Sequence, residues 1–153
     1  MSRRAQISGL EDHVGYWLRF VSNHVSHAFA RKLLKEGITV SEWVALRCLY
    51  DLKECSQNEL AQAMGMTKAP VSRILDRLAA KKLASRSTSA ADGRARLIRL
   101  TEEGHAIVPG LARLADDNDN EFFTCLNKKE QAAIVSLMRK VVAHHGWTQV
   151  PVD

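Results

Sequence analysis

The sequence predicts a mainly α-helical fold that carries one small β-hairpin. Apolar residues recur at steps of three and four along most of the chain, and three capping boxes mark helix starts. Only one segment, around Asp92-Gly93, has the pattern of two short strands joined by a turn. A length of 153 residues, of which 46% are apolar, suits one compact unit with a sizeable core.

Composition excludes several classes of protein. No apolar run approaches the roughly 20 residues that a membrane-spanning helix needs, so no membrane partner is expected. The basic N-terminus is not followed by the apolar stretch of a signal peptide. The three cysteines are odd in number and lack CxxC spacing, which predicts reduced thiols and a cytoplasmic location. They are Cys48, Cys55 and Cys125.

One long amphipathic helix is expected near the start of the chain. Its apolar residues follow steps of three and four from Leu10 to Leu33, and Gly37 can end it in a left-handed conformation. About 25 residues would make a rod of roughly 38 Å. The short elements that follow cannot cover such a rod, so part of its apolar side is expected to meet another chain.

A helix-turn-helix is predicted in the middle of the chain. A capping box at Thr39–Glu42 opens a preceding helix, and a second one at Ser56–Glu59 opens a short helix that Gly65 ends. Thr67 can cap the next helix, which has one apolar side and one basic, polar side. The apolar side comprises Val71, Ile74, Leu75 and Leu78. Two short helices of this pattern, joined by a glycine-containing turn, form a helix-turn-helix.

A hairpin and two long helices complete the chain. Residues 83–86 and 94–100 flank a polar turn and predict two short strands, which form the wing of a winged helix. Thr101 opens a helix whose acidic run, residues 116–121, is expected to face solvent, with a basic partner as the alternative. A third capping box at Asn127–Glu130 opens the last helix.

Positive charge is concentrated in one window. Residues 66–100 contain nine Lys or Arg and two acidic residues, a net charge of +7. Residues 1–65 contribute +1 and residues 101–153 contribute −3, which gives the total of +5. Six of the nine are Arg, the better ligand for phosphate and base edges. The window therefore predicts a polyanion as the partner, and the helix-turn-helix pattern points to double-stranded DNA.

This order of elements resembles the MarR family of bacterial transcription regulators. Most specific is Asp92-Gly-Arg94 followed by Thr101 and Gly104, which is similar to the wing signature of the family. Lys82 departs from the pattern, because many members have glycine there, and the tail after His144 matches no common family motif. The other matching residues are Gly37-Ile-Thr39, Trp43, Leu46, Leu60-Ala61, Gly65, Val71-Ser-Arg73, Leu75-Asp-Arg-Leu78, Leu83, Arg86 and Ile98-Arg-Leu100.

The resemblance implies one MarR-like unit over residues 1–153. Residues 8–36 and 102–146 would form a helical dimerisation region, and residues 39–101 a winged helix-turn-helix lobe. The second helix of the helix-turn-helix would enter the major groove of DNA, and the wing arginine the minor groove. Members often hold a small-molecule effector between the two regions. The expectation is a homodimeric repressor, neither an enzyme nor dependent on a cofactor, that binds a pseudo-palindromic operator.

Candidate DNA contacts lie on the second helix, at helix starts and on the hairpin. Arg73 and Arg77 project from the basic side, where Arg reads guanine or binds phosphate. Arg94 at the hairpin tip suits a narrow, electronegative minor groove. The predicted contacts are Ser56, Gln57, Thr67, Lys68, Ala69, Pro70, Ser72, Arg73, Arg77, Asp92, Arg94 and Arg96.

A candidate effector site consists of His13 and Trp17 on the first helix, and Trp43 and Arg47 on the second. The members of each pair are four residues apart and share a helix face. Aromatic rings beside Arg or His suit a small aromatic acid. The alternative is that both tryptophans pack in the core, the commoner role of aromatics at helical spacing.

Other functions have weaker support in the sequence. The chain lacks GxSxG, Walker A, GxGxxG and HExxH strings, which disfavours an enzyme. A winged-helix adaptor that binds protein would tend to lose the basic side that this chain keeps. His24 and His27 have no evident third metal ligand, and no metal site is predicted. Cys55, at a helix start, is the better candidate for a reactive thiol, so metal- or redox-responsive regulation is an alternative.

Overall fold

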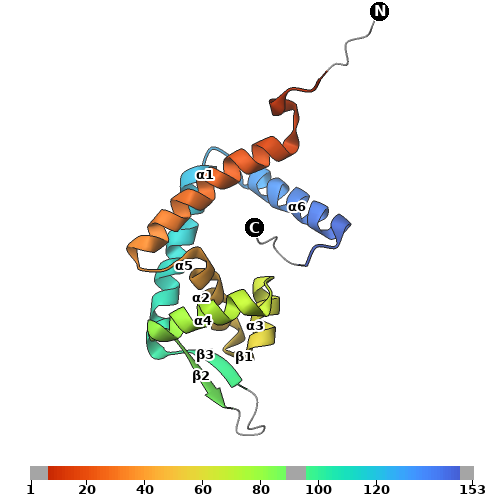
Figure 1. Cartoon of the computed structure of the whole chain (residues 1–153). Coiled ribbons are helices and arrows are strands. Elements are labelled where there is room, and N and C mark those ends of the chain that lie inside the picture. The colour runs from red at the N-terminus through yellow and green to blue at the C-terminus, as the bar shows by residue number, and fades with distance from the viewer. Residues whose placement is uncertain (1–6, 89–95, 149–153) are drawn as a thin grey trace, which may run out of the picture.

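The computed structural model describes residues 7–88 and 96–148 (Figure 1). Within these ranges the chain forms six α-helices and a three-stranded antiparallel sheet of order β1-β3-β2, which confirms the predicted fold class. The helices are α1 (Val14–Lys35), α2 (Val40–Leu52), α3 (Gln57–Met64), α4 (Lys68–Ala80), α5 (Glu102–Phe123) and α6 (Lys128–His145), and a 3-10 turn (Leu10–Asp12) precedes α1. The strands are β1 (Glu54–Ser56), β2 (Ala84–Thr88) and β3 (Arg96–Leu100).

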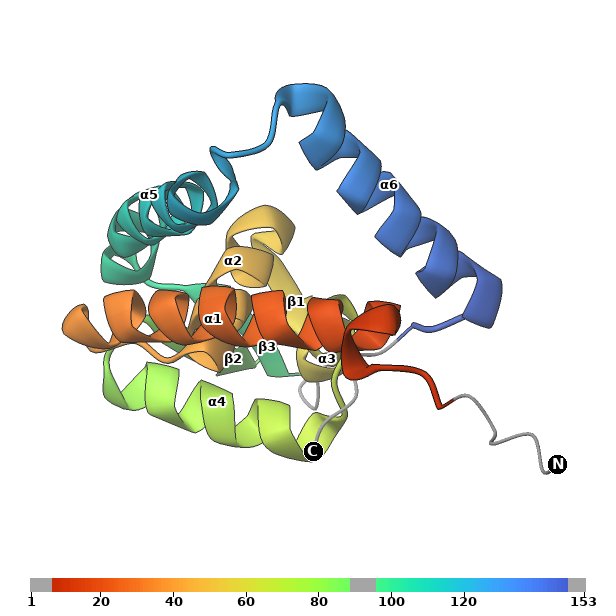
Figure 2. The same cartoon turned by 90° about the horizontal axis from the view of Figure 1, so that it is seen from above.

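The hydrophobic core lies in a lobe formed by α2, α3, α4 and the sheet, together with the end of α1 and the first half of α5. In the view from above, α6 turns back from the end of α5 and stands apart from this lobe (Figure 2). Burial of each large apolar side chain contributes about 1.5–3 kcal/mol, so α4 is held firmly by its inner side. The fully buried apolar side chains include Leu33, Ile38, Leu46, Leu49, Leu60, Val71, Leu75, Leu78, Ile98, Val108 and Leu111.

Helix ends follow the capping that the sequence predicts. Thr39, Ser56 and Asn127 each accept a hydrogen bond from the N–H of the Glu three residues on, whose carboxylate accepts from the N–H of the cap residue. Thr67 occupies the N-cap of α4, but its side chain makes no capping hydrogen bond. Gly37 has a φ of 70°, which confirms the left-handed end of α1.

Strand β1 is missing from the sequence-based prediction. Its three residues pair with β3, with Cys55 opposite Ile98, and both of these side chains are buried. Three residues are too few to show an alternating pattern, which is why the strand escaped notice. The predicted hairpin is confirmed, because β2 pairs with β3 over five residues.

The wing is fastened to the start of α5. The Thr101 N–H donates to the Leu83 carbonyl at 3.1 Å, and the Thr101 hydroxyl donates to the Lys82 carbonyl at 2.6 Å. Gly104 lies against the same segment, since a Cβ at this position would be 2.0 Å from the Leu83 carbonyl oxygen. The segment from Leu100 to Gly104, which contains Thr101, therefore fixes where the hairpin leaves the lobe.

The acidic run on α5 is only partly exposed. Its three aspartates face solvent, as predicted, but Asn118 is buried, and the prediction is wrong at this residue. Lys32 Nζ donates to Asn118 Oδ1 at 3.0 Å, and Asn118 Nδ2 donates to the Val25 carbonyl at 3.2 Å. Lys32 also pairs with Glu121. These polar contacts fix α1 against α5, because a buried amide must keep its hydrogen bonds.

We expect Lys82→Gly to stabilise the fold. Lys82 follows the end of α4 with a φ of 60°, a conformation that a Cβ disfavours. Glycine should raise the free energy of unfolding by about 0.5–1 kcal/mol, measured by urea denaturation at a fixed protein concentration. Lys82→Ala removes the same charge but keeps the Cβ, so it should not share this gain. Equal stability of the two variants would contradict the backbone explanation.

Candidate nucleic-acid interface

Helix α4 presents a polar side to solvent, opposite its buried apolar side. Arg73 occupies the middle of this exposed side, four residues from Ala69 and seven from Ala80. Within residues 7–88 and 96–148, no hydrogen bond or ion pair holds the Arg73 guanidinium. Small neighbours allow a helix to approach a DNA groove closely, and a free guanidinium can reach a base edge. The geometry therefore makes Arg73 available for DNA.

The starts of α3 and α4 are tied together. The Ser56 hydroxyl accepts from the Glu59 N–H at 3.2 Å, and Gln57 Nε2 donates to the Lys68 carbonyl at 3.2 Å. Ser56, the N-cap of α3, and Gln57, its first residue, are predicted DNA contacts that therefore also have a structural role. Thr67 and the Lys68 side chain are exposed at the start of α4, where free N–H groups and the helix dipole favour a phosphate.

Arg86 joins the wing to α4. From β2, its guanidinium donates to Asp76 Oδ1 at 2.7 Å and to the Ser72 carbonyl at 3.3 Å. Asp76 is the acidic residue of α4, so this pair neutralises a charge that would repel DNA. Ser72 and Pro70 are half-buried and lie between the exposed residues Ala69 and Arg73 in the sequence of α4. The contact between Arg86 and Asp76 was not predicted. A single acidic residue on the basic side of a helix indicates that a cation lies near it, and Asp76 could have been recognised in this way.

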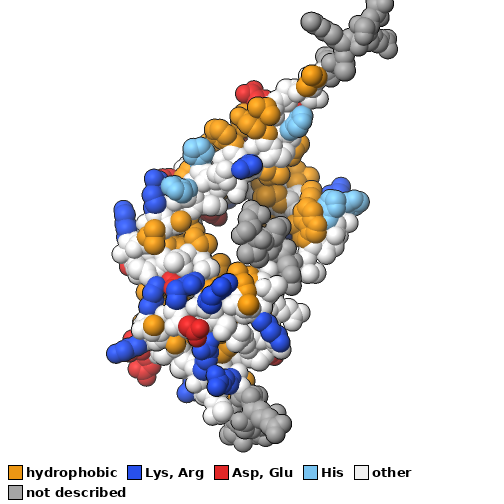
Figure 3. Space-filling model, in the orientation of Figure 1, with side chains coloured by type: hydrophobic (Ala, Val, Ile, Leu, Met, Phe, Trp, Pro, Cys, Tyr) orange, Lys and Arg blue, Asp and Glu red, His pale blue; other side chains and the backbone are white. Residues whose placement is uncertain are grey.

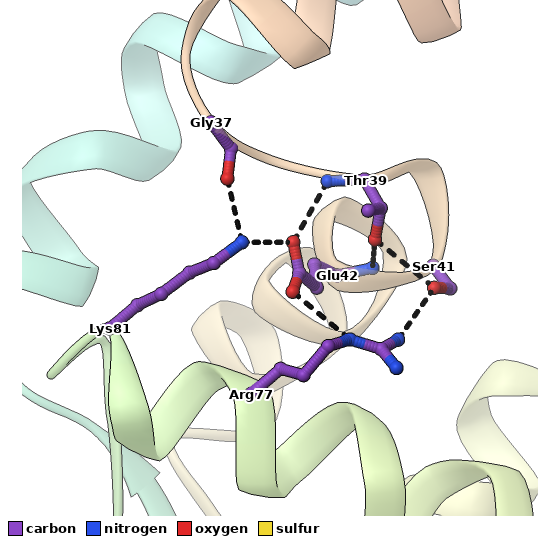
Figure 4. Close-up of polar contacts among 6 residues, drawn as sticks. All are labelled: Gly37, Thr39, Ser41, Glu42, Arg77 and Lys81. Atoms are coloured by element: carbon purple, nitrogen blue, oxygen red, sulfur yellow. Dashed lines mark hydrogen bonds and ion pairs between the residues drawn. The ribbon is translucent and has the colours of Figure 1, made fainter.

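The other end of α4 is fastened to α2 and to the turn before it (Figure 4). Arg77 Nε donates to Glu42 Oε1 at 3.2 Å, and Lys81 Nζ donates to Glu42 Oε2 at 2.7 Å. Arg77 Nη2 also lies 3.5 Å from Ser41 Oγ, and Lys81 reaches the Gly37 carbonyl at 2.6 Å. Arg77 is a predicted DNA contact, and the structure holds one side of its guanidinium within the protein while about half of the side chain stays exposed.

The Glu42 carboxylate is fully buried and is held ionised by these contacts. Burial by itself would raise the pKa of Glu42, but the hydrogen bonds from Lys81 and from the Thr39 N–H outweigh it, so the pKa lies below its ordinary value. The contact therefore stabilises the fold above the unfolded-state pKa of about 4.3, and this contribution is lost as the pH falls through the lower folded-state pKa.

Basic side chains gather over the lobe around α4 and the wing (Figure 3). Arg96 begins β3, opposite Thr88, and is exposed at the wing. Asp92 and Arg94, the predicted tip of the wing, lie outside the described residues, and their roles stay predictions from the sequence. The basic residues of α4 and of the wing strands are Lys68, Arg73, Arg77, Arg86, Arg96 and Arg99.

The four candidate effector residues lie at two separate places. His13 is exposed at the start of α1, and Trp17 beside it donates from Nε1 to the Glu11 carbonyl at 2.9 Å. Trp43 is half-buried and packs edge-on against Phe29, with ring centroids 6.5 Å apart. Trp17 and Phe29 are separated by about 18 Å along α1, because each helical residue advances about 1.5 Å.

Arg47, the fourth candidate, points to solvent rather than to a cavity shared with the others. It pairs with Asp51 one helical turn away, and its guanidinium lies 5.8 Å from the centroid of the Tyr50 ring. A single chain therefore does not bring the four candidates together. Packing explains the position of Trp43, and the effector role of the set stays a prediction.

The structure removes Cys55 as a candidate sensor thiol. Cys55 is buried in β1, and burial, together with the nearby Glu59, raises the pKa of its thiol. Cys55 therefore lacks what a reactive thiol requires, which is a lowered pKa and access to solvent. His24 and His27 are exposed on α1, and the described residues contain no cluster of three metal-ligating side chains.

Two apolar surfaces of the single chain are left exposed. They contain fourteen of the eighteen large apolar residues exposed within the described ranges, and α6 buries none of its residues. None of the described helices has the length and apolarity to cross a membrane. The arm surface comprises Ile7, Leu10, Val14, Trp17, Leu18, Phe20 and Val21. The α6 surface comprises Ile134, Val135, Leu137, Met138, Val141, Val142 and Trp147.

Known proteins share this sequence pattern. The sequence profile of the MarR family matches residues 36–95. The transcriptional regulator HosA of Escherichia coli O157:H7 is 32% identical over 105 residues, which cover 69% of this chain and 78% of HosA. The transcriptional repressor NicR of Pseudomonas putida is 29% identical over 131 residues, which cover 86% of this chain and 83% of NicR.

Solved structures share the fold. The structure of BpsR from Bordetella bronchiseptica, which concerns the regulation of its DNA binding by 6-hydroxynicotinic acid, superposes with a TM-score of 0.80. The two chains are 30% identical, and the match covers 89% of this chain and 97% of BpsR. Sequence and structure thus agree with the helix-turn-helix, the wing and the two long flanking helices, and the chain belongs to the MarR family of transcriptional regulators.

Proposed function

We propose that this protein is a repressor whose homodimer occupies a pseudo-palindromic DNA operator. The observation that carries the proposal is the exposed side of α4, where Arg73 lies beside Ala69 and Ser72 and has no hydrogen bond or ion pair to the described residues, while the rest of the helix is fastened to the lobe. A rigid helix with an unengaged guanidinium is what the major groove requires. The similarity to the repressor NicR supports repression as the outcome.

Dimerisation is assigned to the two exposed apolar surfaces. Residues 8–36 and 102–146 form the dimerisation region in this proposal, and residues 39–101 form the DNA-binding lobe. The arm surface and the α6 surface lie at opposite ends of the sequence, and neither is covered by the lobe. We call α4 the recognition helix, because it is the second helix of the helix-turn-helix. A two-fold dimer would place its two recognition helices in half-sites about one helical turn, 10–10.5 bp, apart.

The predicted contacts divide by chemistry. Arg73 is assigned to a base edge, with Ala69 and Ser72 beside it, because no group within residues 7–88 and 96–148 competes for its guanidinium. Thr67 and Lys68 are assigned to phosphates at the start of α4. Arg77 offers DNA the exposed part of its guanidinium. Arg94, with Asp92, is assigned to the minor groove by the wing signature, and Arg96 to the adjacent backbone.

Selection of genomic fragments by the purified protein tests this function. We expect recovery of a pseudo-palindrome, protection of both half-sites in a footprint, and a steep fall in affinity with salt. A scrambled fragment of the same length and composition is the control. Binding that does not distinguish the two fragments at any salt concentration would contradict sequence-specific regulation, as would the absence of any DNA complex.

We expect a small aromatic acid to release the operator. BpsR is regulated by 6-hydroxynicotinic acid, and the probe used is therefore 6-hydroxynicotinate, with benzoate and nicotinate as analogues. Because a ligand changes DNA affinity only by preferring one state of the dimer, tryptophan fluorescence and DNA release should respond over the same concentration range.

Arg47→Ala tests the predicted anion contact of this effector site. It should abolish the response and leave operator affinity unchanged in ligand-free buffer. A normal response in the variant would leave Arg47 with only its contacts to Asp51 and Tyr50.

The proposed regulator works without catalysis and acts in the cytoplasm, where its DNA partner is found. An adaptor that binds only protein would not need the +7 window of residues 66–100. Buried Cys55 and the absence of a three-ligand cluster in the described chain give no support to redox or metal sensing as the main signal.

A further inference from the structure

The contact that fastens α4 to α2 is more than a helix cap. Three capping boxes of this chain place a glutamate at the third helical position: Glu42, Glu59 and Glu130. Glu59 and Glu130 are exposed, as is usual at a helix start, whereas Glu42 is fully buried. Capping alone does not require burial, so Glu42 has a second role.

The second role is visible in its partners. One Glu42 oxygen serves both the Thr39 N–H, at 2.8 Å, and Lys81 Nζ, at 2.7 Å, while the other accepts from Arg77 Nε. Lys81 continues to the Gly37 carbonyl, in the turn that ends α1. We call this set of Gly37, Thr39, Glu42, Arg77 and Lys81 the corner joint (Figure 4). It links the last turn of α4 to the corner between α1 and α2.

The corner joint differs from the other polar attachments of α4 in what it reaches. The Arg86 contact ties α4 to the wing, and the Gln57 contact ties it to α3, both inside the lobe. The corner joint instead reaches the end of α1, whose other end carries the arm surface. A buried carboxylate with two cationic partners is costly to break, because the charge then loses its compensation.

We propose that Glu42 is a positioning residue that makes the recognition helix α4 follow the dimerisation helix α1. This inference rests on the proposed dimeric function and specifies its regulation. In the dimer, the corner joint fixes the distance between the two α4 helices, and therefore the half-site spacing that the protein accepts. Any ligand that moves α1 then moves Arg73 with it, because α1, Glu42 and α4 form one unit.

Operators of altered spacing test this role without any effector. The wild-type dimer should prefer the selected operator by about tenfold or more over versions with one base pair inserted or deleted between half-sites. Glu42→Gln keeps an acceptor for the cap but removes the charge that holds Arg77 and Lys81. We expect its preference to fall to about threefold or less. A loss of general stability would instead lower binding to all three operators equally.

Glu59→Gln is the matched control, because it makes the same change at an exposed capping box and should keep the wild-type preference. A second measurement is the distance between nitroxide labels on the two protomers, introduced by Ala79→Cys in a Cys125→Ser background. Ala79 is exposed on α4, and Cys125 is an exposed free thiol. The distance distribution should be narrow in the wild type and in Glu59→Gln, and broad in Glu42→Gln.

Lys81→Met provides a second route if Glu42→Gln does not fold. It cuts the link to Gly37 while leaving the Thr39 cap and the Arg77 contact in place. A wild-type spacing preference and a narrow distance distribution in either folded variant would overturn the inference. If the wild-type dimer binds no operator, the proposed function fails, whereas the label distances still decide whether the corner joint positions α4.

Discussion

Replacing Arg73 by alanine is expected to cost the protein most of its affinity for its operator. A bidentate contact between Arg and guanine contributes about 1–3 kcal/mol of discrimination per half-site. Because the dimer makes the contact twice, the operator affinity should fall between about thirtyfold and twenty-thousandfold. The fold should be untouched, since Arg73 is exposed and makes no intramolecular hydrogen bond within the described residues. Thermal melting of the variant checks this point.

The control for Arg73→Ala is Arg113→Ala, which removes an exposed arginine from α5, outside the proposed DNA-binding lobe. Both variants are titrated with operator and with scrambled DNA across a salt series. Loss confined to the operator identifies a base contact, because scrambled DNA offers no matched guanine. Equal loss on both DNAs would assign Arg73 to the phosphate backbone and contradict the proposed readout.

Arg94→Ala belongs in the same salt series and should behave differently. The minor groove distinguishes little beyond A·T from G·C, so the wing arginine contributes to affinity more than to sequence choice. If the dimer loses one phosphate-type contact per subunit, the slope of log K against log salt should shrink by about 2 units. Wild-type binding of this variant to both DNAs at every salt concentration would contradict the wing assignment.

Most of the fold is predictable from local signals in the sequence. The caps at Thr39, Ser56 and Asn127 occupy the predicted positions, because a capping box depends on residues only three apart. Strand β1 and buried Asn118 were not predicted. Both depend on partners far along the chain, β3 for the strand and α1 for the amide, and local patterns do not report such neighbours.

The candidate site is predictable as a surface but not as a set of contacts. The basic side of α4 follows from its helical period, and its exposed and buried positions agree with the structure. The helical period does not show which cations have an acidic partner. Arg77 and Lys81 pair with Glu42 on α2, and Arg86 of β2 pairs with Asp76 on α4. Among the arginines of α4, only tertiary structure distinguishes a free Arg73 from a partly held Arg77.

A single substitution on the α6 surface tests the proposed dimerisation. Leu137 is 63% exposed in the single chain and lies in the middle of the α6 surface. A glutamate there should leave the lobe folded, since Leu137 contributes nothing to its core. In the dimer the same carboxylate would be buried without a partner, and two-fold symmetry would place it in the interface twice. We therefore expect Leu137→Glu to weaken dimerisation by about a thousandfold or more.

Sedimentation at low micromolar concentration measures this effect. The wild type should sediment at about 34 kDa, twice the chain mass of 17.1 kDa, and Leu137→Glu at the mass of one chain. Leu52→Glu is the control, because Leu52 is 42% exposed at the end of α2 and lies outside the dimerisation region of residues 8–36 and 102–146. Operator binding should be lost together with the dimer, since one lobe contacts only one half-site and the second contact becomes bimolecular. A wild-type chain that is folded and monomeric, or a Leu137→Glu variant that remains dimeric, would contradict the proposal that a second copy covers the α6 surface.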